Sequence, residues 1–233
     1  MKKLKYKIRK IVNKFGIDVY PLDYRNSVQS YLQALIAQHN LTEIWDVGAN
    51  SGQYAQMLRF LNYRGKIISF EALPNAYSVL ETKSKTDPSW IVNGPFAIGT
   101  QTGRVIFYET VDSVSSSILR PKFSNIAQKI EVDVKPLSEF IPEPASAGQK
   151  LLKLDVQGAE VDVIKSCGNN INYFEFIQLE ASIKPLYDDE INYIQIIELL
   201  DTIGFQPIFF FPGIGNEKNE VVQLEIIFTK HAK

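Results

Sequence analysis

Acidic side chains recur at the points where apolar runs of this chain end. Asp46, Glu71, Asp155 and Glu180 each close such a run. Carboxylates in these positions can hold the hydroxyl groups of a ribose, bind a cation such as Mg²⁺ through oxygen, or accept a proton from a reacting group. These four acids are therefore the first candidates for binding and catalysis.

A glycine-bearing turn follows the first of these acids. Residues 45–54 read Trp-Asp-Val-Gly-Ala-Asn-Ser-Gly-Gln-Tyr. Gly48 and Gly52 let the chain turn tightly and let a ligand approach bare backbone, and the amides at the start of the next helix can hold an anion. Glu71 ends the second apolar run, where it can accept hydrogen bonds from two ribose hydroxyls. This arrangement predicts a nucleoside-binding site.

The spacing within the turn distinguishes two nucleoside cofactors. A dinucleotide turn reads Gly-x-Gly-x-x-Gly, whereas this one reads Asp46-x-Gly48-x-Asn50-x-Gly52. A carboxylate at position 46 repels a pyrophosphate but attracts an ammonium group. S-adenosylmethionine carries an ammonium, a carboxylate and a ribose, so it is favoured over NAD. The alternative to both is an empty α/β sheet whose glycines only make turns.

Strand-like and helix-like segments alternate along the chain and place each acid at the carboxyl end of a strand. Repeated strand–helix–strand units imply a mainly parallel sheet with helices on both faces, and the short last connection implies an antiparallel last strand. We predict an α/β fold with a seven-stranded sheet of this kind, in which ligands bind beyond the carboxyl ends of the strands. The expected strands cover residues 43–48, 66–71, 90–98 with an interruption at Gly94-Pro95, 150–155, 174–180, 205–211 and 220–228. The expected helices cover 53–61, 74–83, 159–166 and 191–203.

Two shorter strands interrupt this alternation at residues 103–110 and 130–134, and they enclose a polar loop over residues 111–125. The loop is too long to be a simple connection. It is either functional or poorly ordered, and its serine-rich part from Asp112 to Leu119 is either a lid over a bound substrate or a disordered insertion. At the start of helix 191–203, Asp188 or Asp189 is the expected N-cap.

The composition is that of a soluble globular protein. Of the 233 residues, 45% are hydrophobic and 22% are charged, and the net charge of −1 gives no general attraction to nucleic acid. Cys167 is the only cysteine, so no intramolecular disulfide can form, which fits a cytoplasmic location. We expect Cys167 to be a small packed hydrophobe. No apolar run approaches the roughly 20 residues that span a bilayer.

Basic residues concentrate at the N-terminus, where the first fourteen residues hold seven Lys and Arg and no acid. Leu4, Ile8 and Ile11 fall on one side of a possible helix there. The segment is either an interfacial helix that rests on anionic lipid, which would make the protein membrane-peripheral, or a solvated arm. We therefore expect a basic helical arm over residues 1–40 and a ligand-binding domain over residues 41–233.

Several of these segments together resemble the FkbM family of S-adenosylmethionine-dependent methyltransferases. The motif of the first turn is shared widely by methyltransferases, but the Lys-hydrophobic-Asp-Val-x-Gly-Ala-Glu run and the serine-rich segment are more specific. The chain departs from the family at Gln157, where Glu is common, and at Ala72-Leu73, where Pro often follows the acid. The matching segments are Asp46–Tyr54, Ser69–Ala72, Ala97–Gly99, Gly103–Tyr108, Ser115–Leu119 and Leu152–Glu160.

The resemblance implies that residues 41–233 form a Rossmann-like class I methyltransferase domain. It implies methyl transfer to a hydroxyl group of a sugar, a glycan or a natural product. The departure at Gln157 weakens the case for acid–base or metal chemistry at that position. The residues assigned to cofactor binding are Asp46, Gly48, Asn50, Gly52, Tyr54, Glu71, Ala72, Ala97 and Asp155.

A hydroxyl acceptor has to lose a proton, either to a base or with help from a divalent ion that lowers its pKa. The two histidines, His39 and His231, do not lie at predicted strand ends. We therefore predict that Asp155 and Glu180 are catalytic, as a base or as oxygen ligands for Mg²⁺. Lys153 either faces the other side of its strand or pairs with one of these acids.

Two other functions are compatible with the same residues: a non-catalytic nucleoside-binding protein on the same fold, and an N-methyltransferase of a small-molecule amine. Nucleic-acid methylation is disfavoured, because the chain lacks an Asn-Pro-Pro-Tyr-type motif and any basic patch beyond its arm. Glu160 either takes part in the site or only favours the dipole of its helix. Five aromatic residues either stack on a sugar or belong to the core, namely Tyr54, Tyr187, Phe209, Phe210 and Phe211.

Overall fold

The computed structural model describes residues 10–15, 27–143 and 147–231 of the chain. Contacts divide the chain into two units, residues 1–38 and 39–233. The N-terminal unit contains a 3₁₀ turn at Asn13–Phe15 and most of helix α2, Val28–His39. Residues 1–9, which carry most of the basic charge of the predicted arm, lie outside the described ranges, so its membrane contact stays a prediction. Within those ranges, no helix has the length and apolar character needed to cross a bilayer.

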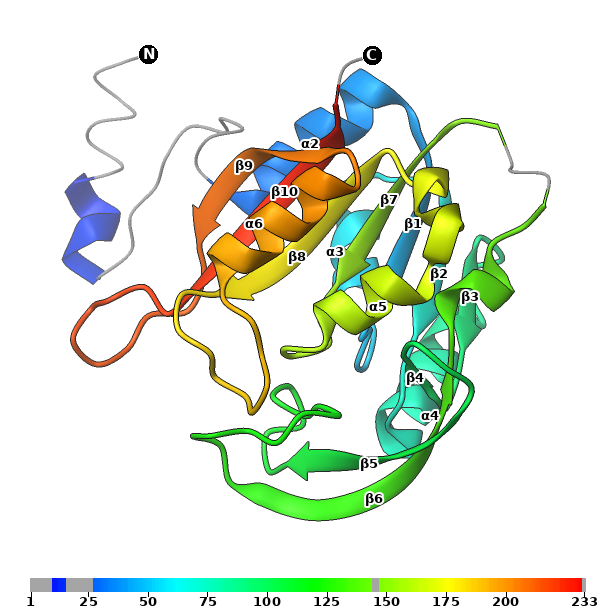
Figure 1. Cartoon of the computed structure of the whole chain (residues 1–233). Coiled ribbons are helices and arrows are strands. Elements are labelled where there is room, and N and C mark those ends of the chain that lie inside the picture. The colour runs from blue at the N-terminus through cyan, green and yellow to red at the C-terminus, as the bar shows by residue number, and fades with distance from the viewer. Residues whose placement is uncertain (1–9, 16–26, 144–146, 232–233) are drawn as a thin grey trace. The chain divides into compact units, whose positions relative to one another are not determined.

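A seven-stranded sheet forms the centre of residues 39–233, with the order β3-β2-β1-β7-β8-β10-β9 (Figure 1). The neighbours from β3 to β8 pair in parallel, and β10 is antiparallel to both β8 and β9. This confirms the predicted seven-stranded sheet with an antiparallel last strand. The strands are β1 Leu41–Val47, β2 Lys66–Phe70, β3 Trp90–Asn93, β7 Gln149–Leu154, β8 Phe176–Ser182, β9 Phe205–Pro212 and β10 Gln223–Lys230.

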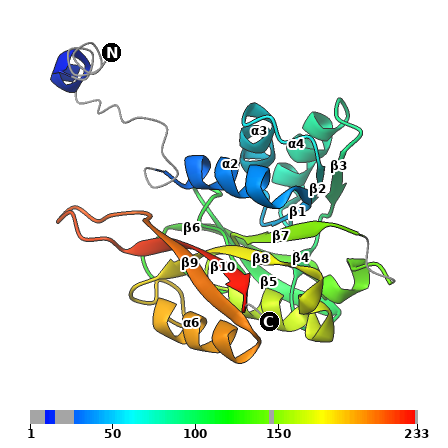
Figure 2. The same cartoon turned by 90° about the horizontal axis from the view of Figure 1, so that it is seen from above.

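Helices cover both faces of this sheet, as predicted. Figure 2 shows α3 and α4 on one side of the strands and α6 on the other. The central strands β1 and β7 are buried along nearly their whole length, as expected for parallel strands that are covered on both faces. The helices are α3 Gln53–Phe60, α4 Pro74–Ser84, α5 Glu160–Ser166 and α6 Tyr193–Thr202, with 3₁₀ turns at Leu137–Phe140 and Gly168–Tyr173.

The start of α6 differs from the prediction. Asn192, rather than Asp188 or Asp189, is the N-cap, and its side chain accepts hydrogen bonds from the amides of Ile194 and Gln195. The Gln195 side chain accepts a bond from the Asn192 amide in return, which completes a capping box. The Asn-x-x-Gln spacing was a sequence signal for this start.

A second sheet of three strands, in the order β4-β6-β5, stands apart from the first. Its strands are β4 Ala97–Ile98, β5 Gly103–Thr110 and β6 Ile126–Lys135. The predicted strand over residues 90–98 is divided at Gly94-Pro95, where an interruption was expected, but its two parts belong to different sheets, which was not expected. The chain leaves the large sheet at Gly94-Pro95, where proline offers no amide hydrogen to a ladder, and β4 then pairs with β6.

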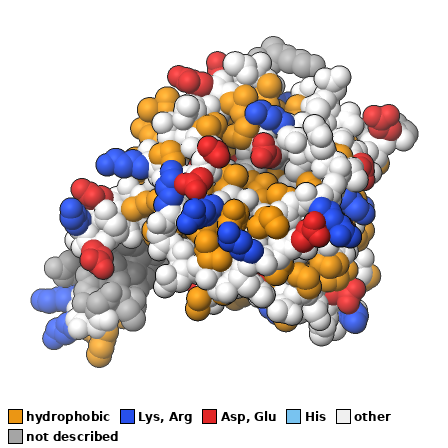
Figure 3. Space-filling model, turned by 60° about the horizontal axis from the view of Figure 1, so that its bottom comes forward, with side chains coloured by type: hydrophobic (Ala, Val, Ile, Leu, Met, Phe, Trp, Pro, Cys, Tyr) orange, Lys and Arg blue, Asp and Glu red, His pale blue; other side chains and the backbone are white. Residues whose placement is uncertain are grey.

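The small sheet lies beyond the carboxyl ends of the central strands, on the side where ligands bind in such folds (Figure 1). Leu73, Phe107 and Val132 form part of its apolar packing. The surface on this side carries hydrophobic side chains between charged ones (Figure 3). The polar loop between β5 and β6 is thus placed near the predicted site.

Candidate active site

A row of polar side chains crosses the middle of the large sheet. The strand register aligns Ser69 with Asp46, Asp46 with Lys153, and Lys153 with Gln178. Paired residues in adjacent strands point to the same face, and each of these four is at most 7% exposed. Polar groups that are buried in this way have to satisfy one another.

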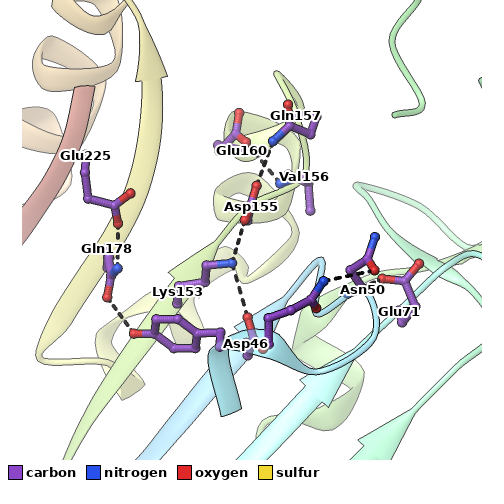
Figure 4. A network of polar contacts seen from close by, with 12 residues as sticks. Asp46, Asn50, Glu71, Lys153, Asp155, Val156, Gln157, Glu160, Gln178 and Glu225 are labelled. Carbon is purple, nitrogen blue, oxygen red and sulfur yellow. Dashed lines mark hydrogen bonds and ion pairs between the residues drawn. The ribbon is translucent and has the colours of Figure 1, made fainter. Parts of the chain in front are cut away.

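Lys153 lies at the centre of this row. Its Nζ lies 2.9 Å from Asp155 Oδ2 and 3.3 Å from Asp46 Oδ1 (Figure 4). It also lies over the ring of Tyr54, 5.1 Å from the ring centroid. Burial by itself would lower the pKa of Lys153, but the charges of Asp155 and Asp46 outweigh it and raise the pKa above its ordinary value. Lys153 is therefore a buried ammonium that pairs with two of the predicted site acids.

Asp46 itself is fully buried. Burial raises the pKa of its carboxyl, and the charge of Lys153 acts in the opposite direction. A carboxylate without exposed surface acts on a ligand through its neighbours rather than by direct contact. The cofactor role assigned to Asp46 stays a prediction of this indirect kind.

Glu71 and the turn after β1 are joined by backbone hydrogen bonds. Glu71 Oε2 accepts from the amide of Asn50 at 2.7 Å, and Oε1 accepts from the amide of Leu73 at 2.8 Å. Burial raises the pKa of Glu71, while these backbone bonds lower it. A carboxylate offers about four lone-pair sites, and the amides of Asn50, Leu73 and Ala72 leave at least one of them for the predicted ribose contact.

The two glycines of the turn are fixed by close packing. Gly48 has a φ of +83°, and a Cβ on it would lie 1.9 Å from the carbonyl oxygen of Asp155. Gly52 has a φ of +87°, and a Cβ there would meet the ring of Trp90 at 2.7 Å. The turn thus brings the ends of β1 and β7 into direct contact. Ala72 and Ala97, the other assigned cofactor residues, lie in the apolar packing of the small sheet.

Asp155 directly follows the last residue of β7, as predicted, whereas Glu180 lies two residues before the end of β8, which runs to Ser182 rather than ending at Glu180. Asp155 is 34% exposed, and its Oδ1 accepts a hydrogen bond from Gln157 Nε2 at 2.8 Å. Burial, followed by the charges of Asp155 and Glu225, raises the pKa of Glu180 to about 7. A carboxyl group with this pKa can accept a proton near neutral pH. Within the described residues, no group of three or more His, Cys, Asp or Glu side chains is arranged to hold a metal ion.

A second chain of polar contacts starts at Tyr54. Its hydroxyl donates to Gln178 Oε1 at 2.6 Å, and Gln178 Nε2 donates in turn to Glu225 (Figure 4). Sequence reasoning missed Gln178 and Glu225. One signal was available, because Gln178 stands two residues before Glu180 in an otherwise apolar strand, as Lys153 does before Asp155, and such residues share a face.

The serine-rich part of the loop between β5 and β6 contacts the turns after β1 and β7. Ser117 Oγ donates to the carbonyl of Val156 at 3.2 Å, and Asn50 Nδ2 donates to Ser113 Oγ at 3.4 Å. The loop therefore lies against both parts of the site. Its motion as a lid stays a prediction.

Tyr187 is fully buried and connects this loop to the turn after β7. Its hydroxyl lies 3.0 Å from the carbonyl of Ser115 and 2.8 Å from Oε1 of Gln157. The segment around it is fixed by the Glu190 carboxylate, which accepts from the Tyr187 amide. Tyr187 was proposed as an aromatic residue of the rim or the core; the structure buries it under the serine-rich loop.

Other candidates lie outside the reacting centre. Glu160 accepts a hydrogen bond from the amide of Val156 and so stabilises the turn after β7. Burial raises the pKa of Glu160 to about 8. Burial raises the pKa of Cys167 to about 12, as suits a packed thiol. His39 packs against Phe176, and His231 lies 3.1 Å from Asp201. On β9, the rings of Phe209 and Phe211 stack on each other, and Phe210 is exposed.

The chain is similar to known methyltransferases over most of its length. Residues 46–207 match the family model described as the methyltransferase FkbM domain. The 2-O-methyltransferase NoeI of Sinorhizobium fredii is 27% identical over 184 residues, which cover 72% of this chain and 74% of that protein. The hexuronic acid methyltransferase AglP of Haloferax volcanii is 22% identical over 145 residues, 61% of this chain and 57% of that protein.

A solved structure supports the fold. It is a Listeria monocytogenes protein assigned as an S-adenosylmethionine-dependent methyltransferase. Its TM-score is 0.51 and its identity 11%, with 88% of this chain and 98% of that chain covered. At this identity the likeness concerns the fold alone, which is that of a class I methyltransferase.

Proposed function

The chain belongs to the FkbM methyltransferase family and is an S-adenosylmethionine-dependent methyltransferase, and we propose that it methylates a hydroxyl oxygen of a sugar or glycan. Two curated relatives support this acceptor class, since one is named a 2-O-methyltransferase and the other a hexuronic acid methyltransferase. The single observation that carries the proposal is the pair of carboxylates, Asp155 and Glu180, near the ends of β7 and β8. They lie beside the turn after β1, residues 48–52, which we call the cofactor turn.

In the proposed reaction the carboxylates of Glu180 and Asp155 have different roles. When bound, S-adenosylmethionine supplies the methyl group and the sulfur leaving group, so that the protein mainly aligns the acceptor oxygen and removes its proton. Glu180 takes this proton as the new oxygen–carbon bond forms and the sulfur–carbon bond breaks. Asp155, which Lys153 and Gln157 hold in place, accepts a hydrogen bond from the acceptor and orients it.

The predicted role of Asp155 and Glu180 as Mg²⁺ ligands fits this arrangement poorly. Both oxygens of Asp155 already accept hydrogen bonds, one from the Lys153 ammonium and one from the Gln157 amide. Mg²⁺ prefers six oxygen ligands in nearly octahedral geometry, and an ammonium on one of those oxygens opposes it. No step of the proposed reaction therefore passes through a metal ion.

The proposal is tested by measuring S-adenosylhomocysteine release with a panel of acceptors: nucleotide sugars, free uronic acids, glycolipids and simple amines. We expect turnover with at least one acceptor that carries a sugar hydroxyl, and a methyl ether as the product by mass spectrometry. Cofactor binding, measured by calorimetry, is the control that shows the protein is active in its first step. Turnover with amines alone would contradict the proposal and favour N-methylation.

A further inference from the structure

Gln157 occupies a constrained position directly after the β7 carboxylate. Its φ is +56°, in the left-handed region that few residues other than glycine adopt, and Gly158 follows with a φ of +95°. A Cβ on Gly158 would press on Tyr187 at 3.1 Å and on Leu119 at 3.3 Å. The chain therefore turns sharply here, and the Gln157 side chain points back toward Asp155 (Figure 4).

The orientation of the Gln157 amide follows from its partners. Asp155, as a carboxylate, only accepts hydrogen bonds, so the NH₂ group of Gln157 has to face it, and the contact measures 2.8 Å. The amide oxygen then faces the hydroxyl of Tyr187, also at 2.8 Å. The Gln157 side chain also acts to lower the pKa of Glu180, against the larger effects of burial and nearby charge. Gln157 thus hydrogen-bonds one proposed acceptor-site carboxylate directly and lies near the other.

Both oxygens of Asp155 already have partners within the protein. Lys153 Nζ lies 2.9 Å from Oδ2, and the Gln157 amide donates to Oδ1. A divalent cation shared by Asp155 and Glu180 would have to compete with this amide for Oδ1. It would also need an oxygen that the buried ammonium already contacts, and the two positive charges repel each other.

We propose that Gln157, together with Lys153, replaces a divalent cation between Asp155 and Glu180, so that this site works without Mg²⁺. The inference rests on the proposed function, because that function assigns the two carboxylates to the methyl acceptor. Gln157 is a positioning residue in this scheme: it holds Asp155 and, through Tyr187, connects the carboxylate to the serine-rich loop.

A glutamate at position 157 would reverse this arrangement. It would lose the donor that faces Asp155 and would add a third carboxylate beside Asp155 and Glu180. Three carboxylates on one side of the turn offer the oxygen ligands that hard divalent cations prefer. The substitution Gln157→Glu should therefore create a metal site that the natural chain lacks.

The test uses the full chain saturated with S-adenosylhomocysteine and titrated with MnCl₂, with free Mn²⁺ followed by electron paramagnetic resonance. Gln157→Glu is compared with Gln206→Glu, a matched amide-to-acid change at an exposed position of β9. We expect Gln157→Glu to bind one Mn²⁺ about tenfold or more tightly than the natural chain, a gain that depends on ligand charge. Gln206→Glu should not differ from the natural chain, and adding Asp155→Asn to Gln157→Glu should remove the site.

Two outcomes would overturn the inference. One is a Mn²⁺ ion on the natural chain that Asp155→Asn abolishes, and this comparison decides the question even where Gln157→Glu does not fold. The other is a folded Gln157→Glu variant that binds Mn²⁺ no better than Gln206→Glu. Neither measurement needs a methyl acceptor, so a failure of the acceptor panel and a failure of this inference are separate results.

Discussion

The cofactor turn and the acceptor carboxylates meet at one edge of the sheet, but different kinds of contact hold them. Around the turn, two backbone amides, those of Asn50 and Leu73, donate to the single carboxylate of Glu71. Around the acceptor carboxylates, side chains from β7, the turn after it and the segment near Tyr187 contact one another. The contacts around the cofactor turn depend on the backbone conformation of a short segment. The contacts around the acceptor carboxylates depend on side chains that meet only when distant segments of the chain have packed together.

This difference implies that the two parts can be changed separately. A substitution among the acceptor carboxylates should alter turnover and leave cofactor affinity unchanged, and a substitution of Glu71 should do the opposite. Lys153 is the exception, because it pairs both with Asp46, in the strand that leads into the cofactor turn, and with Asp155 beside the acceptor.

Glu180→Gln and Asp155→Asn test the acceptor part. Each removes a charge that accepts or orients the hydroxyl, so we expect kcat to fall by about 10²–10⁴-fold, the usual contribution of a positioned proton acceptor. The affinity for S-adenosylhomocysteine, measured by calorimetry, should not change in Glu180→Gln. The sequence also assigned Asp155 to cofactor binding, and an unchanged affinity in Asp155→Asn would limit that residue to the acceptor. Full activity in either variant would remove that residue from the mechanism.

Lys153→Met tests the residue that joins the two parts. It leaves Asp46 buried without its counter-charge, and the loss of one partner from a buried ion pair costs about 3–5 kcal/mol of unfolding free energy. Urea denaturation measures this loss. Lys129→Met, at an exposed position on β6, is the matched control and should change little. Adding Asp46→Asn to Lys153→Met should restore part of the stability; an equally large loss in the double variant would argue against the pairing.

Glu71→Ala tests the cofactor part. Hydrogen bonds to a charged group contribute about 1.5–3 kcal/mol, so we expect about 10- to 100-fold weaker binding of S-adenosylhomocysteine by calorimetry. Glu81→Ala, on the exposed surface of α4, should bind normally. Unchanged affinity in Glu71→Ala would refute the ribose contact.

The pKa of Glu180 predicts the pH dependence of turnover. Only the ionised carboxylate accepts a proton, so kcat should fall about tenfold for each pH unit below about 7 and level off above it. The raised pKa also means that the folded state binds the proton more tightly than the unfolded state. The contribution of Glu180 to the unfolding free energy should therefore decrease as pH rises from about 4.5 to about 7, and Glu180→Gln should make the slope in this range smaller by that contribution. A pH profile unaltered in the variant would assign the ionisation to another group.

Tyr187→Phe is the mildest test of the separation. It removes the hydroxyl that Gln157 and Ser115 share, a loss of about 1 kcal/mol, or roughly fivefold in the KM for the acceptor. Cofactor affinity should stay the same. Tyr193→Phe, at the start of α6, serves as the control, and equal effects of the two substitutions would show that Tyr187 has no special role in the site.

The parts of the molecule that local sequence determines could be predicted. Asp155 and Glu180 end apolar runs, and short connections between such runs leave few topologies, so the seven-stranded sheet and the strand-end acids followed from the sequence. The departure of the chain at Gly94-Pro95 into a second sheet did not, because it depends on pairing with β6, about forty residues later.

The partners of the site acids were harder to predict for a similar reason. Tyr54 and Gln178 are 124 residues apart, and Gln157 and Tyr187 are 30 residues apart, yet each pair shares a hydrogen bond. Neither contact repeats at a fixed interval, so no periodicity reveals it. The side-chain contacts around the acceptor carboxylates therefore became visible only once the strands were paired.

The polar row across the sheet also bears on how the strands find each other during folding. A slip of β7 by one residue against β1 would turn Lys153 to the opposite face. Asp46 would then remain charged and without its counter-ion between apolar layers. Every misaligned pairing of these two parallel strands is penalised in this way, so the buried ion pair selects a single alignment from the many that uniformly apolar strands would allow.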